Sequence, residues 1–161
     1  MQADQEATIT RLFNACRRNR LEMLLEIIPS KVGPVDDFTN AKLINRFYDI
    51  GVYPDWWKLE PMQTTAAWAA TCDAINSRDP HTQGIVILGL GQSEAELAAS
   101  FRLAADFPLV KGFAVGRTIH AAVGRDWIAG KIDDATAVAT MAESFRRLCG
   151  IWDDARKGAK A

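Results

Sequence analysis

Residues 84–93 read Gly-Ile-Val-Ile-Leu-Gly-Leu-Gly-Gln-Ser, and this stretch decides the fold class. The run of branched apolar side chains predicts a strand over Gly84–Gly89. Ser93 and Glu96 have the spacing of a capping box, which predicts a helix that begins at Glu94 and runs to Ala105. A strand that passes through glycines into a helix is the repeating unit of a parallel α/β fold.

The same alternation extends along the rest of the chain. Strands are predicted at Leu21–Ile28, Asp55–Glu60 and Lys111–Val115, and the first is a nearly continuous apolar run of the kind found in covered parallel strands. Helices are predicted over these ranges: Gln5–Arg18, Asp36 or Asp37 to about Ile50, Gln63–Asn76, Ile119–Ala129, and Asp133 to about Lys157. The pattern indicates one α/β domain over residues 1–161 with a parallel sheet and right-handed crossovers. Two architectures fit it: a small open doubly wound sheet, or half of a (β/α)8 barrel.

Apolar side chains at helical spacing define the expected core of the helical layer. The second helix is expected to bury Phe38 and Tyr48 on its apolar side. The final helices are expected to bury Trp127, Phe145 and Trp152.

The composition excludes several classes of protein. The chain has 161 residues, of which 48% are apolar, and a net charge of −1, which is typical of one cored domain. A near-neutral balance argues against a nucleic-acid partner, which usually needs a basic surface. The apolar stretches are too short to cross a bilayer, and no secretory signal is recognisable, so no membrane partner is expected. The cysteines, Cys16, Cys72 and Cys149, are odd in number and widely spaced, which favours a reduced, cytoplasmic protein.

Lys58 is the sharpest functional candidate, because it interrupts an apolar strand between Trp57 and Leu59. Burial disfavours a charged amine and frees it as a nucleophile, which can condense with a ketone to give an iminium. The alternative is structural: Lys58 extends past the tryptophans to solvent, or pairs with Glu60 or Glu26.

Glu26 and Glu60 are the candidate proton carriers. Glu60 has the same side-chain parity as Lys58 on its strand, and Glu26 is near the end of the preceding strand. A carboxylate at this position suits proton transfer during imine formation, whereas a salt bridge to a lysine is the alternative.

Two glycine-containing turns at strand ends are candidate anion sites. Gly89 and Gly91 precede a predicted helix, where open backbone amides and the helix amino terminus attract anions. Gly116 and Arg117 repeat the arrangement after the next strand and add a guanidinium suited to phosphate. The alternative is that these glycines belong to ordinary turns that bind no ligand. No histidine-rich cluster or Ser-His-Asp arrangement is visible, so neither a metal nor another cofactor is expected.

Three segments together resemble a known family. They are residues 24–29 (Leu-Leu-Glu-Ile-Ile-Pro), 55–61 (Asp-Trp-Trp-Lys-Leu-Glu-Pro) and 112–118 (Gly-Phe-Ala-Val-Gly-Arg-Thr). They resemble the carboxyl-terminal aldolase-like domain of bacterial myo-inositol catabolism proteins, which follows a 5-dehydro-2-deoxygluconokinase. The chain is also similar, more distantly, to tagatose-1,6-bisphosphate aldolases, class I enzymes with a (β/α)8 barrel. The resemblance runs from about Glu6 to Arg156.

The resemblance implies roles for individual residues. Lys58 matches the Schiff-base lysine, Glu26 the carboxylate on the preceding strand, and Arg117 the phosphate ligand after the last strand. Gly89 and Gly91 fall in the neighbouring phosphate loop. The implied reaction is reversible aldol cleavage of 6-phospho-5-dehydro-2-deoxygluconate to dihydroxyacetone phosphate and malonate semialdehyde.

The sequence departs from the family in length, since the matching segments correspond to strands five to eight of the barrel. Half a barrel leaves two open sheet edges and an unfilled interior. The chain is therefore expected to associate with a second copy, to pair with a complementary amino-terminal half, or to form an open sheet, and self-association is favoured.

Three functions remain open from the sequence. The first is a class I aldolase acting through Lys58 on a small sugar phosphate. The second is a non-catalytic module that binds a sugar phosphate or associates with the kinase. The third is a flavodoxin-like nucleotide binder using Gly89 and Gly91, which ranks last because a short glycine pair is a weak signal. Kinase activity is not indicated, since no Gly-x-x-x-x-Gly-Lys-Ser/Thr loop is present.

Overall fold

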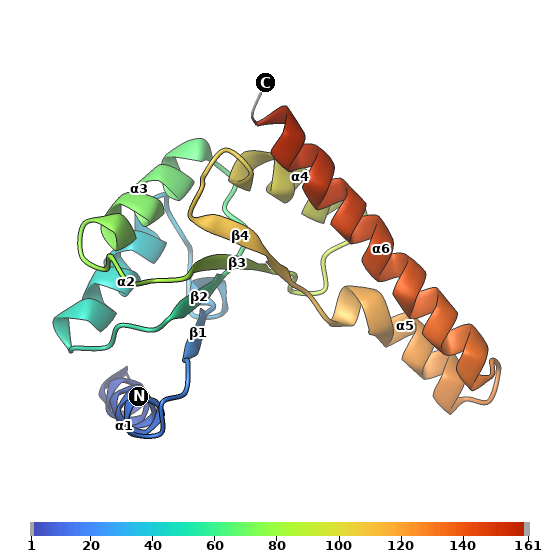
Figure 1. Ribbon diagram of the computed structural model, residues 1–161, viewed down its shortest axis with the longest axis horizontal. Coiled ribbons are helices and arrows are strands. Elements are labelled where there is room, and N and C mark those ends of the chain that lie inside the picture. The colour runs from blue at the N-terminus through green and yellow to red at the C-terminus, as the bar shows by residue number, and fades with distance from the viewer. Residues whose placement is uncertain (1, 160–161) are drawn as a thin grey trace.

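The computed structural model describes residues 2–159, and strands alternate with helices along the chain as predicted (Figure 1). The strands are β1 (Leu24–Ile27), β2 (Trp56–Leu59), β3 (Gly84–Leu88) and β4 (Val110–Ala114). The helices are α1 (Gln2–Arg18), α2 (Thr39–Asp49), α3 (Thr65–Asn76), α4 (Glu94–Ala104), α5 (Arg117–Ile128) and α6 (Asp134–Gly158), with a short 3-10 turn η1 (Pro29–Lys31) after β1.

The four strands form one parallel sheet in the order β1-β2-β3-β4, which is also their order in the chain. Consecutive parallel pairing joined by helices is the construction of a (β/α)8 barrel, and it differs from a doubly wound sheet, in which the strand order reverses. The fold therefore corresponds to four βα units of a barrel.

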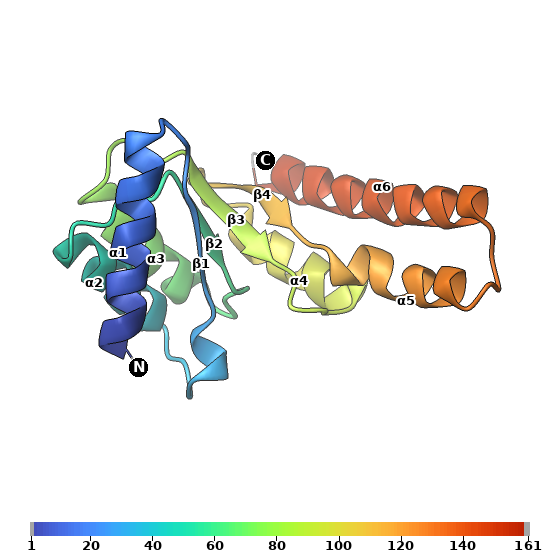
Figure 2. The same cartoon turned by 90° about the horizontal axis from the view of Figure 1, so that it is seen from below.

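One face of the sheet is covered by helices (Figures 1 and 2). Trp57, Leu59, Ile85 and Ile87 alternate with more exposed neighbours and are fully buried in the main hydrophobic cluster. The indole of Trp57 donates a hydrogen bond to the hydroxyl of Tyr48 at 3.2 Å, which satisfies the polar end of a buried ring. Period-two burial thus fixes which side chains of each strand face the helices.

The other face, which we call the open face, has no helical layer within residues 2–159. The side chains of Leu24, Glu26, Trp56, Lys58 and Val86 share it, since their strand register places them level with one another. Leu24 is 48% exposed and Trp56 is partly exposed. In a complete barrel this face would line the interior.

Helices α5 and α6 pack against each other as a hairpin that extends beyond the sheet (Figure 2). This position corrects part of the expected core. Trp152 is buried where α6 packs on α4, with its ring edge-on to Phe101, but Trp127 and Phe145 are 48% and 51% exposed. No helix within residues 2–159 combines the length and apolar character needed to cross a membrane.

Several predicted boundaries also change. The strand predicted from Leu21 begins at Leu24, and Leu21 is exposed. Phe38 is exposed and stands at the amino end of α2 instead of packing on its apolar side. Asp36 does not cap that helix; its carboxylate accepts hydrogen bonds from the Phe38 amide and the Thr39 hydroxyl in the preceding turn. The capping box of Ser93 and Glu96 at α4 is confirmed.

Candidate functional site

The carboxyl ends of the four strands line one pocket of about 290 Å³. It contains six of the seven residues selected from the sequence: Glu26, Lys58, Gly89, Gly91, Gly116 and Arg117. The remaining lining residues are Ile28, Lys31, Leu88, Leu90, Ala114, Thr118 and His120. The pocket is close to the lower limit of small-molecule sites, and it lies where parallel α/β folds place their ligands.

Lys58 and Glu26 form an ion pair across the first two strands. They are direct neighbours in the parallel register of β1 and β2, and the Lys58 Nζ lies 2.9 Å from the Glu26 Oε1. Their side chains are 22% and 38% exposed, respectively. The amine is therefore largely but not fully withdrawn from water, and the ion pair that the sequence left as an alternative is present. An adjacent carboxylate is also the group that could accept a proton from this ammonium.

Glu60 is not brought to the pocket. It follows β2 and is 7% exposed, and its carboxylate accepts hydrogen bonds from the Ser30 amide at 3.1 Å and from the Ser30 hydroxyl. Those contacts secure the turn η1 to the end of β2. A buried carboxylate bound in this way holds the backbone in place, a role that its spacing from Lys58 did not reveal.

The turn after β3 has a backbone that favours glycine. Gly91 has a φ of +79° and Leu90 a φ of +50°, and the Gln92 amide donates to the Gly89 carbonyl at 2.8 Å. A Cβ on Gly89 would lie 2.6 Å from the Val115 Cγ1, so the absence of a side chain permits close approach of the segment after β4.

A side-chain hydrogen bond joins the turn after β3 to the first turn of α5, which follows the turn after β4. The Thr118 hydroxyl donates to the Gln92 carbonyl at 3.0 Å, and both turns contribute to the pocket. Together with the close approach at Gly89, this bond fixes the two predicted phosphate loops relative to each other.

The two helix amino termini beside the pocket differ in how they are capped. At α4, the Glu96 carboxylate accepts a hydrogen bond from the Ser93 amide at 2.8 Å, and bonds from the Ser93 backbone and hydroxyl lower the pKa of Glu96. At α5, Gly116 is the N-cap residue and supplies no side-chain cap. The first turn of α5 therefore keeps backbone donors for an anion, whereas a carboxylate already occupies the first turn of α4.

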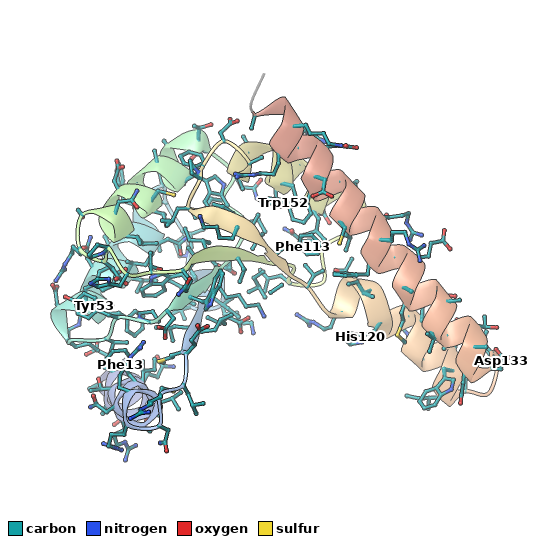
Figure 3. The ribbon with its side chains drawn as sticks, viewed as in Figure 1. Phe13, Tyr53, Phe113, His120, Asp133 and Trp152 are labelled. Atoms are coloured by element: carbon teal, nitrogen blue, oxygen red, sulfur yellow. The ribbon has the colours of Figure 1, made fainter. Side chains whose placement is uncertain are left out.

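His120 and Lys31 also line the pocket. The sequence favoured a surface role for His120, with a ligand contact as the alternative, and it offered Lys31 only as a possible salt-bridge partner of Glu26, which pairs with Lys58 instead. His120 lies on the first turn of α5 beside the end of β4 (Figure 3). Lys31 ends η1, just beyond the carboxyl end of β1. The rule that selected Arg117, a cationic side chain just after a strand, would have selected Lys31 as well.

The pocket is therefore cationic. Lys31, Lys58 and Arg117 line it, and Glu26 is its one carboxylate among the described residues. Residues 2–159 contain no group of three or more His, Cys, Asp or Glu side chains arranged to hold a metal ion. The electrostatics favour a small anionic ligand such as a phosphate ester.

Fold and pocket define a class: a parallel chain of four βα units with a lysine-bearing pocket at the carboxyl ends of its strands, similar to part of an aldolase TIM barrel. Residues 1–156 match the family described as "Uncharacterized protein conserved in bacteria (DUF2090)", and the chain belongs to that family.

Among solved structures, the chain is similar to fructose-bisphosphate aldolase from Plasmodium falciparum, solved in complex with TRAP and a small-molecule inhibitor. The TM-score is 0.57 at 19% sequence identity, with 94% of this chain and 48% of that chain covered. The chain thus spans about half the length of that aldolase, and the similarity shows a shared fold. A comparison with curated proteins found no match.

Proposed function

We propose that this chain is the lysine-bearing half of a class I aldolase and cleaves a phosphorylated keto sugar acid through a Schiff base on Lys58. The observation that carries the proposal is the placement of the Lys58 amine 2.9 Å from the Glu26 carboxylate, in the same pocket as Arg117 and the glycine loops. An amine, a proton carrier and an anion site are the parts this chemistry needs.

The proposed reaction begins when Glu26 takes a proton from the Lys58 ammonium. The neutral amine adds to the ketone carbon of the substrate, and loss of water leaves an iminium. The iminium accepts the electron pair of the neighbouring carbon–carbon bond as that bond breaks and the adjacent hydroxyl loses its proton to form an aldehyde. Protonation of the resulting enamine and addition of water release the ketone product and regenerate the amine. A carboxylate close to the nitrogen can carry these protons in turn.

The phosphate of the substrate is assigned to the loops after β3 and β4. Gly116 leaves the amino terminus of α5 without a side-chain cap, and Arg117 adds a guanidinium to the same pocket. Backbone donors at a helix terminus and a guanidinium are a suitable pair of ligands for a phosphate ester.

The particular substrate rests on the family resemblance. We propose 6-phospho-5-dehydro-2-deoxygluconate in myo-inositol catabolism, with dihydroxyacetone phosphate and malonate semialdehyde as products. The second candidate is a non-catalytic sugar-phosphate-binding or association module of the kinase system. The observed ion pair fits this second candidate if Lys58 serves only to neutralise Glu26 and forms no Schiff base.

Borohydride trapping separates the two candidates. The protein is incubated with dihydroxyacetone phosphate and sodium borohydride, and its intact mass is measured. A class I aldolase gives a covalent adduct that disappears in Lys58→Ala and persists in Lys131→Ala, a control at an exposed lysine outside the pocket. Absence of an adduct in the wild type, with sugar-phosphate binding retained, supports the binding module.

We also propose that a second copy of the chain covers the open face. β1 and β4 are the two unpaired edges of the sheet, and the chain spans 48% of a barrel enzyme. Glu22 lies just before β1 and Lys111 lies on β4, so opposite charges would meet near the amino ends of these strands if two copies joined edge to edge. Two half-barrels related by a two-fold axis along the strands keep all strands parallel and leave no edge.

A further inference from the structure

Two of the three cationic side chains in the pocket have no acidic partner among the described residues. Lys58 is paired with Glu26 at 2.9 Å, but neither Lys31 nor Arg117 forms an ion pair with any residue in 2–159. Lys31 and Arg117 therefore present two uncompensated positive charges to one pocket. Unpaired like charges in a shared site are most simply explained by a ligand that carries negative charge at more than one position.

Lys31 and Arg117 approach the pocket from opposite ends. Lys31 follows β1 and Arg117 follows β4, the two outermost strands, and Lys58 lies on β2 between them. Three interstrand spacings separate the outermost strands, about 14 Å along the sheet. Long side chains reaching inward from such a separation match the two ends of an extended sugar chain whose ketone, between those ends, is within reach of Lys58.

The position of Lys31 is fixed by a buried anchor. Ser30, the residue before Lys31, donates from its amide at 3.1 Å and from its hydroxyl to the Glu60 carboxylate, which is 7% exposed. The Val32 amide donates to the Pro29 carbonyl at 2.9 Å and closes the turn around Lys31. A lysine on an anchored turn loses less entropy on binding than one on a free loop.

We propose that Lys31 forms a second anion subsite, which holds a carboxylate or second phosphate at the end of the substrate opposite the Arg117 phosphate. Glu60 is a positioning residue that acts through Ser30. The inference rests on the proposed function for the orientation of the substrate, and it names the residue that would bind the anionic group at the end opposite the phosphate. It also gives a reason for the burial of Glu60 away from the reacting amine.

Two matched ligands without a ketone test the subsite independently of Schiff-base chemistry. 6-Phosphogluconate carries a phosphate and a terminal carboxylate, whereas sorbitol 6-phosphate has a hydroxymethyl group in place of that carboxylate. Titration calorimetry on the full chain should show 6-phosphogluconate binding about tenfold more tightly. Mannitol 1,6-bisphosphate provides the bisphosphate case, and the tighter of the two doubly anionic ligands identifies the group that the subsite prefers.

Substitutions assign the selectivity to Lys31. Lys31→Ala should bring the affinity ratio of 6-phosphogluconate to sorbitol 6-phosphate close to one and weaken sorbitol 6-phosphate much less than 6-phosphogluconate, and Lys31→Arg should keep most of the ratio. Lys42→Ala, an exposed lysine on α2 outside the pocket, is the matched control and should change neither affinity. Arg117→Ala should weaken both ligands by a similar factor, since both carry the phosphate.

The positioning role of Glu60 can be tested separately, through the same affinity ratio. Ser30→Ala and Glu60→Gln should each lower the affinity ratio while sorbitol 6-phosphate binding persists, a change that a general loss of folding would not produce. If Glu60→Gln does not fold, Ser30→Ala still decides the point.

A wild-type ratio of one, or a ratio that survives in Lys31→Ala, overturns the subsite. If borohydride trapping gives no adduct but the wild type still prefers 6-phosphogluconate over sorbitol 6-phosphate, the proposed lyase activity is wrong and the anion subsite stands.

Discussion

Replacing Gly89 by alanine should push apart the two loops that form the proposed phosphate site. The new Cβ would lie 2.6 Å from the Val115 Cγ1 and 3.0 Å from its Cβ, about 1 Å short of ordinary carbon–carbon contact. Gly89 does not have a positive φ, so the effect comes from crowding alone. Overpacking of this kind costs about 1–3 kcal/mol of unfolding free energy. A shift of about 1 Å between binding groups can lower a reaction rate by about 10²-fold.

Urea denaturation and borohydride trapping measure the two effects on the same preparation. Gly124→Ala on α5 is the matched control, because nothing lies within 4 Å of its new Cβ and the position is helical. That substitution should raise the unfolding free energy by about 0.5–1 kcal/mol and leave trapping unchanged. The reasoning is refuted if Gly89→Ala is as stable as the wild type, or if it loses stability while trapping proceeds at the wild-type rate.

Three further variants probe the framework. Burial alone would raise the pKa of Asp55, but hydrogen bonds from Arg17 and the Met23 amide lower it. Asp55→Asn should therefore lower the unfolding free energy by about 1–3 kcal/mol at pH 7, as measured by urea denaturation. That deficit should hold above about pH 4 and shrink as the pH falls through the lowered pKa; a pH-independent deficit contradicts it. Ser93→Ala should cost about 1 kcal/mol in the same assay by removing the α4 cap, and an unchanged midpoint contradicts this. Leu24→Glu on the open face should convert a dimer to a monomer in sedimentation velocity, and a monomeric wild type excludes the proposed assembly.

The order and type of elements could be predicted because each strand and helix has a clear local period. Strand β3 carries an unbroken apolar run, and Ser93 with Glu96 marks the start of α4 through contacts within one turn. The exposure of Trp127 and Phe145 could not be predicted in the same way. An apolar helical stripe indicates that something will cover it, but not that the hairpin of α5 and α6 extends beyond its own sheet.

The position of the pocket could be predicted from the topology of the sheet, whereas the contacts of the individual residues could not. Parallel strands bring their carboxyl ends together, which is why Lys58, Glu26 and Arg117 line the same pocket. Side-chain parity placed Glu60 beside Lys58, but Glu60 follows the end of β2, where its carboxylate binds Ser30 instead. Contacts between a strand end and a turn some thirty residues away leave no periodic signal in the sequence.

The reactivity of Lys58 and the coverage of the open face are physically linked. Lys58 and Glu26 lie on that face, and their side chains keep 22% and 38% of their exposure in the isolated chain. A second copy packed over the face would exclude water from the pair and so keep water away from a Schiff base formed there. Covering the face also buries Leu24, which gives the assembly an apolar driving force. Dimerisation would therefore both close the sheet and shield the reacting groups from water. Loss of self-association in Leu24→Glu should slow adduct formation even though Lys58, Glu26 and both phosphate loops are unchanged.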